Sequence, residues 1–125
     1  KQGDTISNIP PILSPLLHRR IQPYLTSLFA FDPAAEISKL GIPVLILQGD
    51  TDVQVSLEDA KLLAGAAKSG TLVTLPNVNH VLKFSDHRDK RRQVEETYDA
   101  PLVPISGAAV SAMAGFISTL SKSGR

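Results

Sequence analysis

The sequence predicts an α/β fold built on one parallel strand–helix–strand unit. An unbroken apolar run over 42–47 ends abruptly at Gly49, a pattern typical of a parallel strand buried on both faces. A helical stripe follows over about 57–68, and a short run rich in branched residues follows over 71–75. Because parallel strands need a long crossover between them, we expect two parallel strands, at about 42–48 and 71–75, joined by the helix.

The composition is that of an ordinary globular domain. The 125 residues are 42% apolar and 20% charged, which is enough for one core. Thirteen basic and twelve acidic residues give a formal net charge of +1. The chain therefore has no strong positive electrostatic field to attract nucleic acid, and we expect no nucleic-acid partner. There is no cysteine, and no apolar run approaches the roughly 18 residues that a membrane span needs.

The chain divides into residues 1–40, expected to be a linker followed by helices, and residues 41–125, expected to form one core segment. Residues 1–8 are polar and unpatterned, as in a linker. Over 13–29 the apolar residues recur at helical spacings, but Pro23 lies among them. Proline inside a helix removes a hydrogen bond and clashes with the preceding turn, so we expect two short helices or one bent helix.

Capping residues mark further helix ends. Asp32–Pro33 predicts an N-cap with proline at the first helical position, and Ser56 predicts the N-cap of the crossover helix. The polar stretch 83–104 is expected to be loop with one helical turn. A last helix is expected over 107–121. Its predicted buried side consists of Val110, Met113, Ala114, Ile117 and Leu120.

Two polar residues follow the two predicted strands. Asp52 comes shortly after the first strand, and His80 comes five residues after Leu75 at the end of the second. The carboxyl ends of parallel strands meet at one edge of a sheet, and neighbouring strands lie about 4.8 Å apart. A carboxylate and an imidazole placed there can hydrogen-bond, which fixes the tautomer of the ring and stabilises its protonated form. Asp52 and His80 are therefore the candidate catalytic pair, two thirds of a nucleophilic triad.

With these residues the chain resembles the carboxyl-terminal part of an α/β-hydrolase, in a bacterial esterase-like subgroup. The matching segments are Gly-Asp-Thr-Asp-Val-Gln-Val at 49–55 and Asn-Val-Asn-His-Val-Leu-Lys at 77–83. The segment 17–25 is similar to the end of the cap that covers the pocket in that subgroup. The resemblance implies an incomplete hydrolase fold that contains the last two parallel strands, with Asp52 as triad acid and His80 as triad base.

The chain departs from the family pattern at several places. Many members have glycine where this chain has Asn79, and proline where it has Ser56. The family's nucleophile motif, Gly-x-Ser-x-Gly, is absent, since Ser111 has neither glycine beside it. The chain also begins with Lys1 rather than methionine. We therefore expect a processed product or a piece of a larger domain that lacks the nucleophile and is inactive alone.

The resemblance implies carboxylesterase- or lipase-like hydrolysis of small acyl esters by the intact parent, without a cofactor. It also suggests that apolar side chains of the cap-type helices roof an acyl pocket, with Leu25, Leu28 and Phe29 as the candidate substrate-binding residues. Similar bacterial proteins are often exported, which favours an extracytoplasmic location for a soluble protein.

The first strand is also a candidate interaction site. A sheet of two strands leaves the apolar strand 42–48 with an open edge, and each of its aliphatic side chains is worth about 1.5–3 kcal/mol when fully buried. We therefore expect this edge to pair with the missing amino-terminal half of the hydrolase or with a second copy of the chain.

Two other interpretations remain open. A haloacid-dehalogenase-type phosphatase places Asp-x-Asp after a buried strand, as Asp50 and Asp52 stand here. A binding or structural module without catalysis is the third possibility. The histidines have no recognised metal-ligand spacing, so we expect no metal site.

Overall fold

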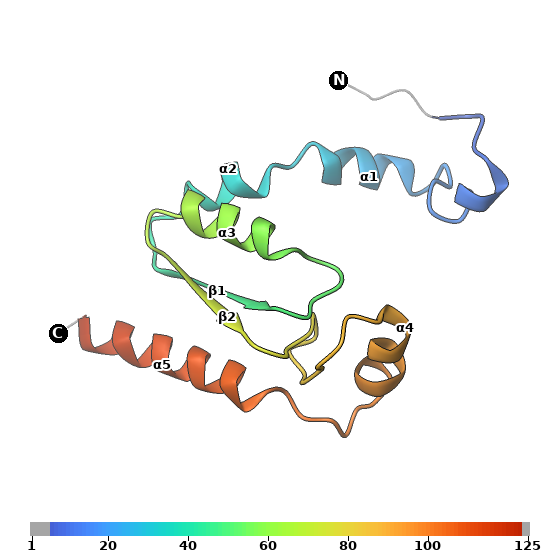
Figure 1. Ribbon diagram of the computed structural model, residues 1–125. Helices are drawn as coiled ribbons and strands as arrows, with labels where there is room; N and C mark the ends of the chain where they lie inside the picture. The colour runs from blue at the N-terminus through green and yellow to red at the C-terminus, as the bar shows by residue number, and fades with distance from the viewer. Residues whose placement is uncertain (1–5, 124–125) are drawn as a thin grey trace.

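The computed structural model describes residues 6–123 and shows a mixed α/β arrangement on a two-stranded parallel sheet (Figure 1). Strands β1 (Val44–Gly49) and β2 (Gly70–Leu75) pair in parallel along their whole length, and helix α3 (Leu57–Ala66) connects them. The predicted strand–helix–strand unit is thus confirmed. The remaining elements are η1 (Pro11–Leu13), α1 (Gln22–Phe29), α2 (Pro33–Ile37), α4 (Lys90–Gln93), the π-helix η2 (Val94–Tyr98) and α5 (Gly107–Ser123).

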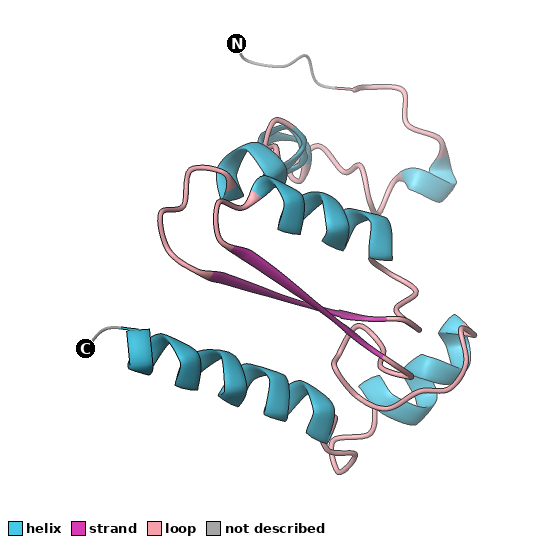
Figure 2. Ribbon diagram, turned by 60° about the vertical axis from the view of Figure 1, so that its left-hand side comes forward, coloured by secondary structure: helices cyan, strands magenta, loops and turns pink. Residues whose placement is uncertain are grey.

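The sheet lies between two helices. Helix α3 covers one face and α5 lies along the other, as both views show (Figures 1 and 2). The core is small: Leu75, Val78 and Ala109 are its buried centre, and partly buried apolar side chains pack around them. Those surrounding residues are Leu47, Val73, Leu82 and Met113. The side chains of β1 from Val44 to Leu47 are only half-buried instead of buried on both faces, because a sheet of two strands cannot enclose them.

Two predicted caps are confirmed at helix starts. Asp32 Oδ1 accepts hydrogen bonds from the backbone N–H groups of Ala34 and Ala35, at 3.0 and 3.2 Å. Ser56 opens α3 with a capping box, in which its hydroxyl and the Asp59 side chain each bond the other residue's backbone N–H. These local bonds begin the helices where the sequence places them.

The amino-terminal helices differ from the prediction in two respects. Pro23 lies in the first turn of α1, where its missing N–H has no cost, so it begins a helix instead of bending one. Only Leu13 of the apolar stripe lies in η1, and Leu16, Leu17 and Ile21 lie between η1 and α1, so one short helix forms where a pair or one bent helix was expected. Residues 1–5 of the expected linker lie outside the described residues.

The predicted buried side of α5 is wrong. Val110 and Ile117 are 51% and 65% exposed, whereas Ala109 is fully buried. Of the rest of the predicted set, Met113 packs against the core, while Ala114 and Leu120 are exposed. The helix is apolar nearly all round, so periodicity could not select the face that meets the sheet. The side that meets the core carries Ala109 and Met113.

The segment 83–104 is more helical than predicted. Helix α4 and the π-helix η2 run consecutively over 90–98, and Asp89 caps them by accepting the Arg92 N–H at 2.8 Å. The buried side of this segment is polar, since it carries Gln93 and Thr97. A helix with a polar inner face produces no apolar stripe, which explains why the sequence pattern indicated a loop.

The two loops beyond the strands approach each other at Gly49. A Cβ atom at this position would lie 1.9 Å from the Val78 carbonyl oxygen, so any other residue would collide with backbone. The same carbonyl accepts the Thr51 N–H at 3.3 Å, and the Asp50 N–H donates to Leu75 O at 3.1 Å. Glycine at the end of β1 therefore lets the loops carrying Asp52 and His80 lie side by side.

We predict that Gly49→Ala lowers the free energy of unfolding by about 1–3 kcal/mol, because the added methyl group meets backbone that cannot move independently. Urea unfolding monitored by circular dichroism measures the change. The matched control is Gly65→Ala in α3, where a Cβ meets nothing within 4 Å and alanine favours the helix by about 0.5–1 kcal/mol. Equal stability of Gly49→Ala and the wild type would contradict the close-approach argument.

Candidate active site

The structure brings Asp52 and His80 together, as their spacing after the two strands predicts. Asp52 Oδ2 and His80 Nδ1 lie 3.0 Å apart, in hydrogen-bonding range. The side chain of Asp52 is 5% exposed and that of His80 is 40% exposed. A buried acid thus supports an imidazole that solvent and ligands can reach.

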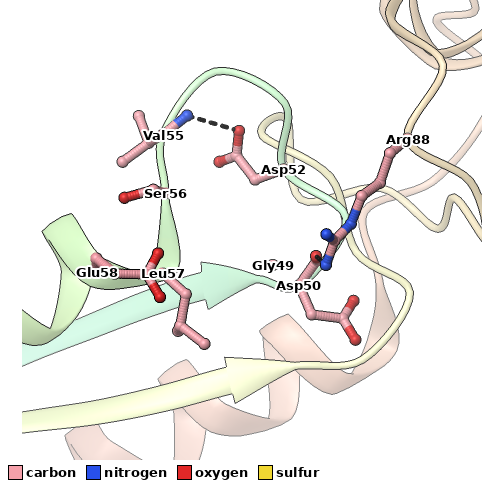
Figure 3. Close-up of a pocket in the computed structure, with 8 residues that line it drawn as sticks. All are labelled: Gly49, Asp50, Asp52, Val55, Ser56, Leu57, Glu58 and Arg88. Carbon is pink, nitrogen blue, oxygen red and sulfur yellow. Dashed lines mark hydrogen bonds between the residues drawn. The ribbon is translucent and has the colours of Figure 1, made fainter.

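The Asp52 carboxylate accepts four hydrogen bonds. Oδ1 accepts the backbone N–H groups of Gln54 at 2.7 Å and Val55 at 3.0 Å, the latter drawn as a dashed line in Figure 3. Oδ2 accepts the side-chain amide of Gln48 at 3.2 Å, besides its bond with His80. Gln48 is itself buried and also donates to Val55 O at 3.0 Å. These bonds fix the orientation of the carboxylate before any substrate arrives.

Burial by itself would raise the pKa of Asp52. The N–H groups of Val55 and Gln54, followed by the His80 ring, outweigh that effect, so the pKa lies below its ordinary value. Asp52 is therefore ionised at neutral pH. A carboxylate that accepts from Nδ1 holds the neutral ring in the Nδ1–H tautomer, which leaves Nε2 as the proton acceptor.

A hollow of about 250 Å³ lies beside the pair. It is lined by Leu47, Gln48, Gly49, Asp52, Val55, Asn79, His80 and Leu82. No hydroxyl or thiol side chain is among these lining residues, and over residues 6–123 no hydrogen bond is made by His80 Nε2. The geometry of the pair is that of a general base, and the lining of this hollow contains no hydroxyl or thiol nucleophile.

A second hollow, of about 270 Å³, adjoins the first on the α3 side (Figure 3). Here Asp50 Oδ1 accepts the Asn77 N–H at 2.6 Å, and Arg88 Nη2 donates to Asp50 O at 2.7 Å. The carboxylates of Asp50 and Asp52 point in different directions (Figure 3). Asp50 is therefore a loop cap that joins one loop to the other.

Neither Ser56, near the pair, nor Ser111, in α5, is placed as a nucleophile. The Ser56 hydroxyl is engaged with Asp59, donating to Oδ2 at 2.8 Å and accepting the Asp59 N–H at 3.1 Å. Ser111 is exposed on α5, which follows the histidine loop. Within the described part of the chain, no three His, Asp or Glu side chains gather as metal ligands.

The predicted substrate-binding residues do not reach the pair. Leu25, Leu28 and Phe29 lie on α1, and none of them lines either hollow. Leu28 is exposed and Phe29 is 80% exposed. Helix α1 lies on the α3 side of the molecule, away from the loops that follow the strands (Figure 1).

Sequence patterns missed several buried polar residues around the pair. Asn79, Gln93 and Thr97 are buried, and Leu82 has a positive φ of 58°. A non-glycine residue in that conformation costs of order 1–3 kcal/mol and is often found at functional sites. The one available signal was Asn79, which stands where the resembling family commonly has glycine.

Comparison with known proteins finds no matching family model, no matching curated protein and no matching solved structure. The hydrolase interpretation accordingly depends on the residues and their geometry. The search for membrane-spanning helices among the described residues finds none of sufficient length and apolarity.

Asp52 makes stability depend on pH. Because its pKa is lower in the folded state, the stabilisation by ionised Asp52 is fully present above the unfolded pKa of about 3.9 and is lost as pH falls through the folded pKa. We predict that Asp52→Asn costs about 1–3 kcal/mol at pH 7, since its amide faces N–H donors, and that the difference from wild type shrinks in acid. Urea unfolding across the acidic range measures this, and a pH-independent difference would contradict it.

Proposed function

We propose that this chain supplies the acid and the base of a serine-hydrolase triad that acts on small acyl esters, with carboxylesterase- or lipase-like chemistry. The observation that carries the proposal is the 3.0 Å contact between Asp52 Oδ2 and His80 Nδ1 beside an open hollow. The nucleophilic serine belongs to residues outside this sequence. The chain alone is then catalytically inactive.

In the proposed mechanism, His80 Nε2 takes the proton of the serine hydroxyl as the oxygen attacks the acyl carbon. The imidazolium that forms lies next to ionised Asp52, which stabilises its charge. His80 then returns the proton to the leaving alcohol, and the ester bond breaks to leave an acyl-enzyme. In the second half, His80 activates water in the same way, and the acid is released.

The geometry favours this proposal over a phosphatase that uses Asp50 and Asp52. Such an enzyme needs both carboxylates at one phosphate group, but Asp50 bonds the Asn77 backbone and Asp52 bonds His80. A purely structural role is less well supported. It does not explain why a solvent-accessible imidazole is hydrogen-bonded to a buried, ionised carboxylate. Magnesium-dependent phosphatase activity would favour the first alternative.

We also propose a partner for the open edge of β1. The described sheet has two strands, so β1 pairs on one side only, while its apolar side chains from Val44 to Leu47 stay half-buried. The missing nucleophile-bearing half of the hydrolase would add a strand there and would bring the serine to His80. Without it, a second copy of the chain would cover the same edge.

In a parent protein that carries the nucleophile, we predict that His80→Ala lowers kcat for short-chain acyl esters by about 10²- to 10⁴-fold, the usual contribution of a general base. Stopped assays with a chromogenic ester measure the rate. The control is His18→Ala, which removes an exposed imidazole whose only hydrogen bond among residues 6–123 is with the nearby Arg20 N–H. A rate for His80→Ala within a few-fold of wild type would refute the assignment.

The edge proposal predicts that the isolated chain self-associates as its concentration rises, which light scattering measures. Leu45→Lys on β1 should reduce the association, since a charged residue blunts an open edge. The matched control is Thr71→Lys, at the register partner of Leu45 on β2. A stable monomer at high concentration would contradict the proposal.

A further inference from the structure

The helical segment 90–98 contacts both loops of the candidate site through polar side chains. It lies at the end of the sheet where the strands finish, close to the two loops (Figures 1 and 2). The proposed mechanism gives this segment no part. Its buried residues nevertheless bond the immediate neighbours of Asp52 and His80.

The first set of bonds holds the acid loop. Gln93 is fully buried, and its Nε2 donates to Thr51 O at 2.8 Å, one residue before Asp52. The side chain of Gln54, whose own N–H caps Asp52, donates to the Tyr98 hydroxyl. The segment therefore bonds the acid loop on both sides of the carboxylate.

The second set holds the histidine loop. Asn79 is fully buried directly before His80, and its Nδ2 donates to Thr97 Oγ1 at 2.7 Å. Asn79 Oδ1 accepts the Lys83 N–H at 3.1 Å, which closes the loop. Lys83 Nζ donates to Thr97 O at 2.7 Å. A glycine in place of Asn79 would have no side chain with which to reach the segment.

The two sets join within one helical turn. Thr97 Oγ1 donates to Gln93 O at 2.5 Å, so a continuous chain of bonds runs from Thr51 through Gln93 and Thr97 to Asn79. Gln93 also donates to His87 O at 2.7 Å, while its Oε1 has no partner within the described residues. A buried glutamine with one unsatisfied oxygen lowers the free energy of unfolding relative to an apolar residue of similar size. Stability alone therefore does not account for Gln93.

We propose that Gln93 and Thr97 are positioning residues that hold Asp52 and His80 at hydrogen-bonding distance. They act through Thr51 and Asn79 and do not themselves touch the pair. The placement of the pair follows from the contacts alone, while any effect on turnover rests on the proposed hydrolase function. Loss of either bond should let the two loops move apart.

The test uses nuclear magnetic resonance on the full chain, because the ring nitrogens of His80 report its tautomer directly. The wild type should show neutral His80 as the Nδ1–H tautomer, with the proton held by Asp52. Thr97→Val, which keeps the shape and removes the hydroxyl, should lose the Nδ1–H signal, and Thr97→Ser should keep it. Gln93→Met should also lose it. The control is Leu63→Ala at a partly buried position of α3, one turn after the buried Ala60; it should lower stability and keep the signal.

The outcomes separate the two proposals. The positioning role would be overturned if Thr97→Val and Gln93→Met fold and keep the wild-type tautomer of His80. It would also be overturned if both variants unfold, or if Leu63→Ala loses the Nδ1–H signal to the same extent. If Thr97→Val loses the signal while His80→Ala leaves the parent's hydrolysis unchanged, the positioning role stands and the hydrolase proposal fails. In an active parent, Thr97→Val should lower kcat by up to about 10²-fold with KM little changed.

Discussion

At the carboxyl end of the sheet, the backbone of Gly49 lies against the carbonyl group of Val78, and this contact sets how closely the two loops approach. The parallel register ends both strands at the same edge of the sheet. The absence of a Cβ at Gly49 then lets the loop after β1 contact the loop after β2. Asp52 and His80 can then meet at 3.0 Å without reaching across solvent. The tautomer of the ring follows from that approach, whereas the ionised state of Asp52 comes mainly from the N–H groups of Val55 and Gln54 in its own loop.

Polar bonds, more than apolar packing, hold the loops in place. The buried apolar centre contains few residues, whereas much of the interior beyond the strands is polar. The buried polar residues are Gln22, Gln48, Thr51, Asn79, Ser85, Gln93 and Thr97. Directional bonds fix both distance and orientation, which suits a site where a carboxylate must face one particular ring nitrogen. The half-buried β1 and the exposed side of α5 show that apolar packing is incomplete around this sheet.

The sequence was sufficient for features that depend on local patterns. An apolar run stopped by glycine, caps at Asp32 and Ser56, and the spacing of Asp52 and His80 after their strands all predicted the observed arrangement. The sequence was insufficient where the apolar pattern is uniform around a helix or where the buried side of a helix is polar. Helix α5 is apolar nearly all round, so its inner face depends on which side fits the sheet. The segment 90–98 has a polar inner face, and its sequence therefore resembles that of a loop. Bonds such as Gln93 to Thr51 join residues far apart in the chain and leave no local signal.

The central proposal is that His80 acts on a serine supplied from outside these residues. Its most direct test is to label a nucleophile-bearing parent with a phosphonate ester and to solve the structure of the adduct. The account predicts one labelled serine with its Oγ about 2.6–3.2 Å from His80 Nε2, and the Asp52 contact retained. A labelled serine remote from His80, or an active parent in which His80 faces no nucleophile, would contradict it.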